Sequence, residues 1–215
     1  MKLVECVPNF SEGRRPEVVD EIVGAMTAVD GVRLLDKEMD ADHNRAVVTI
    51  IGAPEDVLEG AFRGIEKASE LIDLTKHEGE HPRMGATDVC PFVPVRDVEM
   101  DDCIRLAEKL GERVGSELDI PVFLYESAAR RPERQNLAKV RKGQFEGLRE
   151  EIGANPAKEP DFGPSKIHPT AGAIAIGARP FLIAYNINLG TSDLSVAKRI
   201  ARSIRHSGGG LRHVK

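Results

Sequence analysis

His77–Pro94 reads HEGEHPRMGATDVCPFVP and marks the point where a helical pattern gives way to an apolar strand. Its first seven residues hold two histidines, two carboxylates and an arginine. Gly79 weakens a helix from inside, and Pro82 disfavours the helical conformation at the residue before it. The apolar run Val89–Val95 is typical of a buried strand. We therefore predict a polar exit from a helix, followed by a strand.

The same residues also fit a metal-binding pattern. His77-Glu78-Gly79-Glu80-His81 has the histidine spacing and the intervening Glu of the zinc proteases. That chemistry needs both histidines on one face of a continuous helix, and Gly79 and Pro82 break the helix here. We predict no metal site.

Upstream of this segment, strands and helices alternate in a recognisable order. Residues 15–28 place Val18, Val19, Ile22, Val23 and Met26 on one helical face, and a second amphipathic helix starts after Pro54. Strands are predicted at Lys2–Val7, Val32–Leu35, Ala46–Ile51 and Val89–Val95, with a polar loop at Asp36–Arg45. The order β-α-β-β-α-β is that of a ferredoxin-like or split βαβ unit. The fold class is therefore α/β (α+β).

Downstream, the pattern predicts an extended sheet and the start of a second unit. The expected elements are a helix at Asp101–Leu118, strands at Pro121–Tyr125, Ala173–Ile176 and Phe181–Asn188, a helix carrying Leu194 to Ile204, and a strand start at Leu211–Lys215. The polar stretch Glu126–Pro160 is interpreted as a solvated helical connection. We expect one subdomain at 1–178 and an incomplete second α/β subdomain at 179–215. An unfinished sheet edge favours pairing, so we predict a homodimer or a missing C-terminal half as partner.

Composition excludes several classes of function. The chain has 215 residues, 30% of them charged, and a net charge of −5 without a concentrated basic face, which argues against nucleic acid as a partner. No apolar run reaches the length of a membrane span, and the N-terminus lacks the apolar core of a signal peptide. Three unevenly spaced cysteines, Cys6, Cys90 and Cys103, fit reduced thiols and a cytoplasmic location.

Several motifs together resemble the glutamate formiminotransferase family. They are LVECVPNFSEG (Leu3–Gly13), Asn44-Arg45, Leu71-Ile72-Asp73, HEGEHPRMGATDVCPFVPV (His77–Val95), DFGP (Asp161–Pro164) and GARPFLIAYNINL (Gly177–Leu189). The resemblance runs from the N-terminus to about residue 205. It implies a transferase that moves a formimino group between N-formimino-L-glutamate and tetrahydrofolate, giving 5-formiminotetrahydrofolate and glutamate. The natural context is histidine breakdown and one-carbon metabolism.

The family's catalytic histidine falls on His81, by the match Glu80-His81-Pro82-Arg83. The tetrahydrofolate nitrogen must lose a proton as it attacks the formimino carbon, and the departing glutamate nitrogen must gain one. A histidine suits both steps near neutral pH. Arg83 and Arg45 each offer a fork for the substrates' carboxylates. Glu80 could orient His81, contact substrate or simply be solvated. A purely structural reading of His81 is a loop histidine at a helix C-terminus.

A second segment matches the part that the family uses for folate. It comprises Gly163, Pro164, Ser165, Lys166, Ile167, His168, Pro169, Thr170, Ala171 and Gly172. Glycines allow close backbone approach to a flat pterin, and hydroxyl groups can bond its edge. The alternative is a linker between subdomains that binds no ligand.

Two other functions remain open. One is a cyclo-ligase-type reaction on 5-formyltetrahydrofolate, which would consume ATP, although the chain has no P-loop spacing. The other is a non-catalytic folate-binding module.

Overall fold

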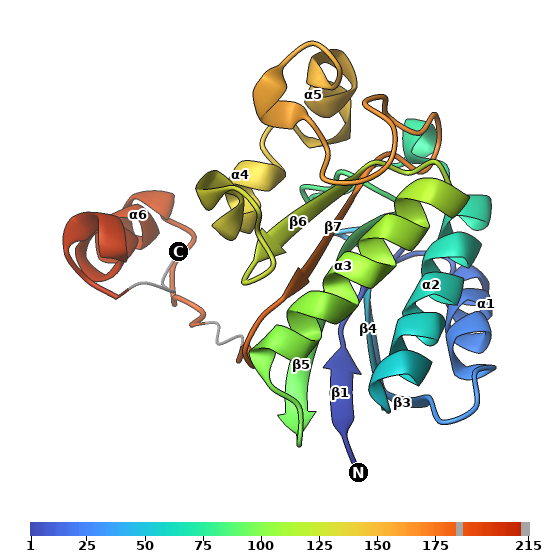
Figure 1. The fold of residues 1–215 in the computed structure, drawn as a ribbon. Helices are drawn as coiled ribbons and strands as arrows, with labels where there is room; N and C mark the ends of the chain where they lie inside the picture. Colours follow the sequence, from blue (N-terminus) through green and yellow to red (C-terminus); the bar gives the residue numbers. More distant parts are fainter. Residues whose placement is uncertain (184–186, 212–215) are drawn as a thin grey trace. The chain divides into compact units, whose positions relative to one another are not determined.

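The computed structural model describes residues 1–183 and 187–211 and separates into two units, Met1–Phe181 and Leu182–Lys215. The first unit is built on a seven-stranded mixed sheet (Figure 1). Its strands are β1 (Leu3–Cys6), β2 (Asn9–Phe10), β3 (Arg33–Asp40), β4 (Arg45–Gly52), β5 (Thr87–Arg96), β6 (Val122–Glu126) and β7 (Ile174–Ala178).

The strand order confirms the predicted α+β fold. β1 lies antiparallel between β4 and β5, and β3 pairs with the far side of β4. This is the antiparallel order of a split βαβ unit. β2 comes next in the chain and pairs with the same two strands as β1, β4 and β5. Beyond β5 the sheet continues in parallel, because β7 pairs with both β5 and β6.

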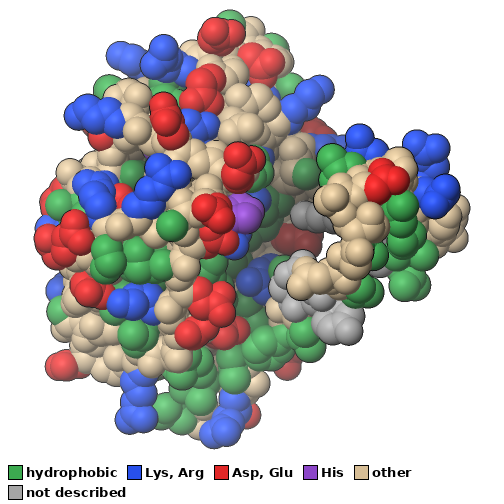
Figure 2. All heavy atoms as spheres, turned by 180° about the vertical axis from the view of Figure 1, so that it is seen from behind, with side chains coloured by type: hydrophobic (Ala, Val, Ile, Leu, Met, Phe, Trp, Pro, Cys, Tyr) green, Lys and Arg blue, Asp and Glu red, His purple; other side chains and the backbone are tan. Residues whose placement is uncertain are grey.

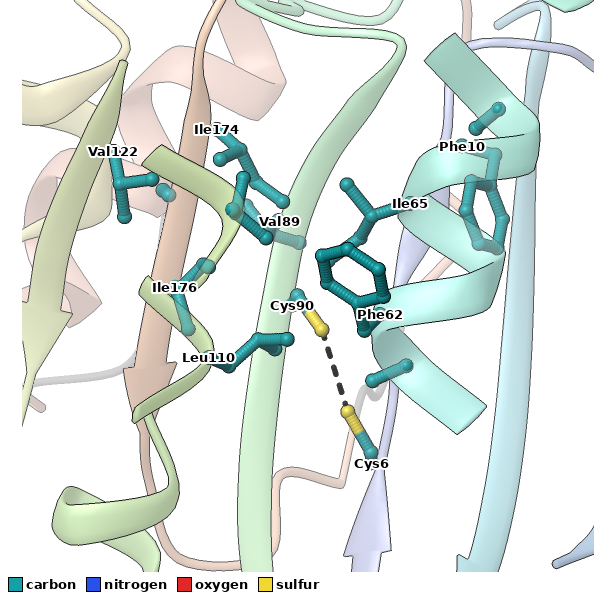
Figure 3. Close-up of a cluster of buried hydrophobic side chains, with 14 of the residues drawn as sticks. Cys6, Phe10, Phe62, Ile65, Val89, Cys90, Leu110, Val122, Ile174 and Ile176 are labelled. Carbon is teal, nitrogen blue, oxygen red and sulfur yellow. Dashed lines mark hydrogen bonds between the residues drawn. The ribbon is translucent and has the colours of Figure 1, made fainter. Parts of the chain in front are cut away.

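Three helices cover one face of this sheet: α1 (Pro16–Thr27), α2 (Pro54–Leu71) and α3 (Met100–Glu117) (Figure 1). β4 alternates strictly between half-buried and buried residues, as expected of a strand with one covered face. The core between helices and strands includes Phe62 and Ile65 of α2, Leu110 of α3 and Ile174 of β7 (Figure 3). Four of the five residues predicted on the apolar face of residues 15–28 are buried, and the fifth, Val23, is partly buried against the core.

The opposite face of the sheet carries apolar side chains interspersed with charged ones (Figure 2). β3 forms an edge, and seven of its eight residues are exposed. The strand predicted at Val32–Leu35 is too short, and most of the loop predicted at Asp36–Arg45 is strand. Backbone hydrogen bonds to β4 hold these polar residues extended without the apolar alternation that the prediction requires.

The connection between β6 and β7 is more than a solvated link. It contains η2 (Pro132–Gln135), α4 (Leu137–Val140), α5 (Gln144–Glu151) and η3 (Pro156–Lys158). Phe145 and Leu148 are buried, and so is Arg134, whose guanidinium pairs with Asp161 at 2.5 Å. The interpretation as a purely solvated segment is wrong, because its cations form specific pairs with carboxylates of the sheet and the following loop.

The second unit contains the predicted helix, α6 (Leu194–Ile204), followed by η4 (His206–Gly208). None of its helical residues is buried, and Leu194, Ile200 and Ile204 are exposed. The strand predicted at Phe181–Asn188 is absent from residues 181–183 and 187–188, and its centre lies outside the described residues. Of the strand start at Leu211–Lys215, only Leu211 is described, in an isolated bridge to Arg205.

Candidate functional site

The histidine segment, which we define as His77–Ala86, lies between η1 (Leu74–Lys76) and β5. It packs against the turn that joins β3 to β4. The backbone N–H of Glu80 donates to the carbonyl of Asp42 at 3.1 Å, and that of His81 donates to the carbonyl of His43 at 3.3 Å. The segment is therefore held by backbone contacts at one end of the sheet.

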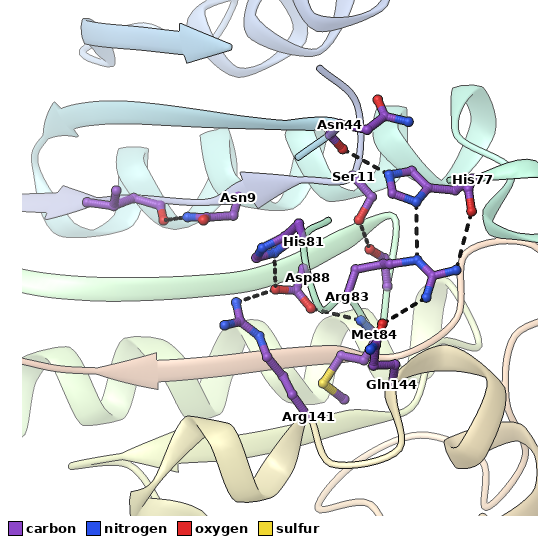
Figure 4. Close-up of polar contacts among 12 residues, drawn as sticks. Asn9, Ser11, Asn44, His77, His81, Arg83, Met84, Asp88, Arg141 and Gln144 are labelled. Carbon is purple, nitrogen blue, oxygen red and sulfur yellow. Dashed lines mark hydrogen bonds and ion pairs between the residues drawn. The ribbon is translucent and has the colours of Figure 1, made fainter. Parts of the chain in front are cut away.

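Asn44 in that turn connects three parts of the chain, and Figure 4 shows its contact with His77. Its side-chain oxygen accepts from the N–H of Gly13 at 2.9 Å, and its amide nitrogen donates to the carbonyl of Glu78 at 3.0 Å. Its own carbonyl lies 2.9 Å from Nε2 of His77. Asn44 also has a φ of 50°, a conformation that asparagine tolerates better than most residues. The Asn44-Arg45 motif is thus partly explained by the shape of the turn.

His81 is buried and contacts an equally buried carboxylate. Its Nε2 lies 3.1 Å from Oδ2 of Asp88, and the two side chains are 4% and 0% exposed. Asp88 is also paired with the guanidinium of Arg141, which belongs to the connection between α4 and α5. Figure 4 shows the three side chains meeting beside the start of β5.

Neither Asp88, the partner of His81, nor Arg141, the partner of Asp88, was predicted from the sequence. A signal for Asp88 does exist in the sequence, because an acidic residue inside a buried strand requires a partner. Arg141 gives no comparable signal. It stands in a run of exposed charges, and only the tertiary structure brings it to Asp88.

His77 and His81 do not act as a pair. His77 bonds to Asn44 through Nε2, whereas His81 turns to Asp88, and neither residue lies in a helix. Within residues 1–183 and 187–211, no group of three or more His, Cys, Asp or Glu side chains is arranged to hold a metal ion.

Arg83 is already engaged within the protein. Its Nε donates to Nδ1 of His77 at 3.1 Å, and its two terminal nitrogens lie 2.9 and 2.7 Å from the carboxylate oxygens of Glu146. Gln144 accepts a further bond from it at 3.1 Å. A substrate carboxylate would have to displace Glu146, whose side chain is 62% exposed. The substrate-binding role of Arg83 stays a prediction.

Arg45 and Glu80, the other two predicted substrate contacts, differ in their surroundings. Arg45 opens β4 and lines a hollow of about 370 Å³ together with Glu38, Met39, Asp40 and Val47. Its Nε is buried and has no hydrogen-bond partner within the described residues. Arg45 therefore has a side-chain donor that no described residue satisfies. Glu80 is exposed, and its side chain makes no hydrogen bond to any residue that the structure describes.

The segment Gly163–Gly172 lies against the end of the histidine segment that leads into β5. The N–H of Ala86 donates to the carbonyl of Ala171, and the N–H of Ala173 donates to that of Met84, both at 2.9 Å. His168 turns inward, where its Nδ1 accepts from the N–H of Ala171 at 2.9 Å, and burial lowers its pKa.

The two terminal glycines of this segment have structural explanations. A Cβ on Gly172 would lie 2.3 Å from the carbonyl oxygen of Met84, and one on Gly163 would lie 2.8 Å from that of Ile120. Both also have a positive φ. Close packing within the protein thus accounts for them without a pterin. Lys166 and Pro169 are exposed, and Ser165 donates to Glu159 at 2.5 Å.

Comparison with known proteins places this geometry in context. Residues 3–179 match a family described as the formiminotransferase domain, N-terminal subdomain. The chain is 53% identical over 214 residues to a glutamate formimidoyltransferase of Streptococcus pyogenes serotype M1, covering 100% of this chain and 71% of that protein. It is 54% identical over 217 residues to a glutamate formimidoyltransferase of Thermoplasma acidophilum, with the same coverage. A formimidoyltransferase-cyclodeaminase of Rattus norvegicus is 51% identical over 209 residues, which span 97% of this chain and 38% of that protein.

Proposed function

The chain belongs to the formiminotransferase family, and from that premise we propose that it transfers a formimino group between N-formimino-L-glutamate and tetrahydrofolate. Two relatives that share more than half of its residues carry the name glutamate formimidoyltransferase. On the structural side, the proposal rests on the buried contact between His81 and Asp88, 3.1 Å between Nε2 and Oδ2. A histidine held by a carboxylate is a common arrangement for moving protons.

His81 serves as the general acid and base of this reaction. A bond forms between N5 of tetrahydrofolate and the formimino carbon, and His81 takes the proton that N5 loses. The tetrahedral intermediate then breaks its bond to the glutamate nitrogen, and His81 returns the proton to that nitrogen. No metal or redox step is needed, because one proton is passed from the attacking to the departing nitrogen.

The substrates are assigned to Arg45 with the hollow beside it and to the segment Gly163–Gly172. Arg45 binds a carboxylate of formiminoglutamate, a role that its unpaired Nε and the hollow beside it support. Glu80 and Arg83 provide further contacts to the substrates. The segment Gly163–Gly172 binds folate, and the hydrogen bond from the N–H of Ala86 to the carbonyl of Ala171, which joins this segment to the histidine segment, supports the assignment.

The test is transfer from formiminoglutamate to tetrahydrofolate by the purified chain, without ATP, beside His81→Gln and the control His206→Gln. His206 is an exposed histidine of η4, in the second unit. We expect His81→Gln to lower kcat by about 10² to 10⁴-fold and His206→Gln to leave it unchanged.

Other outcomes would identify a different function. Turnover of 5-formyltetrahydrofolate that requires ATP would indicate a cyclo-ligase type of reaction. Thermal stabilisation by folate without any turnover would indicate a binding module. Unchanged activity in His81→Gln would contradict the acid–base role.

We also infer a cytoplasmic homodimer. The exposed edge strand β3, with Leu34 and Leu35 41% and 56% exposed, supports pairing with a second copy. Three buried free cysteines support a reducing compartment. Among the described residues no helix is both long and apolar enough to cross a membrane. Size-exclusion chromatography with light scattering tests the dimer, and a monomer at micromolar concentration would contradict it.

A further inference from the structure

Asp88 is a buried charged residue, and the proton transfer at His81 described above gives it no role. Its carboxylate, at 0% exposure, has three polar neighbours. Nε2 of His81 lies 3.1 Å from Oδ2, the N–H of Met84 donates to Oδ1 at 2.9 Å, and the guanidinium of Arg141 pairs with Oδ2. An ionised carboxylate is costly to bury unless donors replace its water, and the N–H of Met84 and the guanidinium of Arg141 do so. Asp88 is therefore held as an anion in one fixed orientation.

Arg141 reaches this carboxylate from a segment that is itself fastened to the histidine segment. The backbone N–H of Phe145 donates to the carbonyl of Arg83 at 3.0 Å. Gln144 and Glu146 both accept from the guanidinium of Arg83. The side chain of Arg141 is only 17% exposed, so its charge lies close enough to offset that of Asp88. The α4–α5 connection thus brings a counter-ion to Asp88.

This arrangement determines which nitrogen of His81 is free. An ionised carboxylate accepts hydrogen bonds but cannot donate them, so Nε2 of His81 must carry the hydrogen of their shared bond. In the neutral imidazole the lone pair then belongs to Nδ1. Among the residues that the structure describes, Nδ1 of His81 has no hydrogen-bond partner. Nδ1 is therefore the ring atom available to a substrate.

We propose that Asp88, held in place by Arg141, is a positioning residue that fixes His81 in the Nε2–H tautomer and leaves Nδ1 to exchange the proton. This inference rests on the proposed function. Nδ1 accepts the proton from N5 of tetrahydrofolate as the new C–N bond forms. The resulting imidazolium, stabilised by the adjacent carboxylate, gives the proton to the glutamate nitrogen as the old C–N bond breaks. Neither Asp88 nor Arg141 touches substrate in this scheme.

The tautomer can be measured directly. Long-range ¹H–¹⁵N NMR spectra of the imidazole, assigned by comparison with His81→Gln, distinguish a protonated Nε2 from a protonated Nδ1. We expect the wild-type ring to be protonated at Nε2. In Asp88→Asn the amide oxygen can keep the bond to Met84 while its NH₂ faces His81, so Nε2 must become the acceptor. The hydrogen should then move to Nδ1.

Steady-state kinetics provide the second readout. Asp88→Asn should lower kcat for formimino transfer by about 10² to 10⁴-fold with little change in KM, because only the wrong nitrogen is left unprotonated. Arg141→Met should lower kcat by about 10- to 100-fold, the range seen when the outer partner of a metal-bound histidine is lost, and Arg141→Lys should recover most of it. The matched control is Lys142→Met, which removes one exposed positive charge at the next residue.

The two readouts separate the failure of this inference from that of the proposed function. If wild type transfers formimino groups but its His81 is protonated at Nδ1, or if Asp88→Asn keeps kcat within about twofold, the inference is overturned. If the tautomer shifts as expected while the wild type does not turn over, the positioning role stands and the proposed reaction fails. If Asp88→Asn does not fold, the two Arg141 variants provide the test. Equal activity in Arg141→Met, Arg141→Lys and Lys142→Met would overturn the role of Arg141.

Discussion

The guanidinium of Arg83 donates from Nε to Nδ1 of His77 across 3.1 Å. Because a guanidinium is always a donor, Nδ1 of His77 must be the unprotonated nitrogen, and Nε2–H donates to the carbonyl of Asn44 at 2.9 Å. His77 is thus a neutral histidine that braces the histidine segment against the β3–β4 turn. His77 therefore has a structural role, and His81 has the chemical role that we propose.

Because His77 is buried in its neutral form, the stability of the protein depends on pH. Burial is the largest cause that lowers the pKa of His77 from its ordinary value, and the nearby charge of Arg83 acts in the same direction. Below about pH 6.5 the unfolded chain therefore binds a proton that the folded chain does not. The free energy of unfolding should fall as the pH drops from this value toward the folded-state pKa of His77. Urea titrations between pH 7.5 and 5 measure this slope.

His77→Gln is the informative variant for that slope. It should be less stable than the wild type at pH 7.5 yet lose less stability on acidification. Part of the slope should remain, because burial also lowers the pKa of His168. An identical pH dependence in the two proteins would contradict a neutral buried His77.

Because Arg83 makes several hydrogen bonds within the protein, replacing it should lower the stability of the fold. Arg83→Met breaks bonds to His77, Gln144 and Glu146 and should lower the free energy of unfolding by about 1–3 kcal/mol. Glu146→Gln should cost less than about 1 kcal/mol, because Glu146 is largely exposed. Urea unfolding measures both, with Lys142→Met, an exposed cation, as the surface control. Unchanged stability with a raised KM for formiminoglutamate would instead support Arg83 as a substrate ligand.

Gly85 of the histidine segment packs tightly against the backbone of Ala173, the residue before β7. A Cβ at Gly85 would lie 1.9 Å from the carbonyl oxygen of Ala173. Gly85→Ala should therefore destabilise the protein by more than about 2 kcal/mol. Gly24→Ala is the matched control, because a Cβ there meets nothing within 4 Å and the residue is exposed in α1. It should stabilise the protein by about 0.5–1 kcal/mol, and thermal melts compare the two.

The three thiols should be unreactive in the native protein. Cys6, Cys90 and Cys103 are buried, and Sγ of Cys6 lies 3.4 Å from that of Cys90 (Figure 3). Burial raises the pKa of Cys103 to about 11 and that of Cys6 well above its ordinary value. Since the thiolate is the reactive form, a disulfide reagent at pH 8 should label the native chain slowly and all three thiols after denaturation. Rapid labelling of the native protein would contradict their burial.

The fold could be predicted largely from local patterns. Apolar residues at helical spacing, such as Val57, Leu58, Ala61 and Ile65 in α2, are buried as expected. β3 was harder to recognise, because an exposed edge strand is held by backbone bonds to one neighbour and needs no apolar alternation. The position of β7 between β5 and β6 also depends on pairings across the chain, which periodicity does not encode.

The sequence by itself determined the family resemblance, the β-α-β-β-α-β order and the choice of His81, because motif and periodicity are local properties of the chain. Only the tertiary structure showed that Asp88 and Arg141 lie beside His81 and that Glu146 occupies the fork of Arg83. Arg141 follows Asp88 by 53 residues, and Glu146 follows Arg83 by 63. A charged side chain far along the chain looks the same in sequence whether it meets water or a buried carboxylate, and packing alone distinguishes the two.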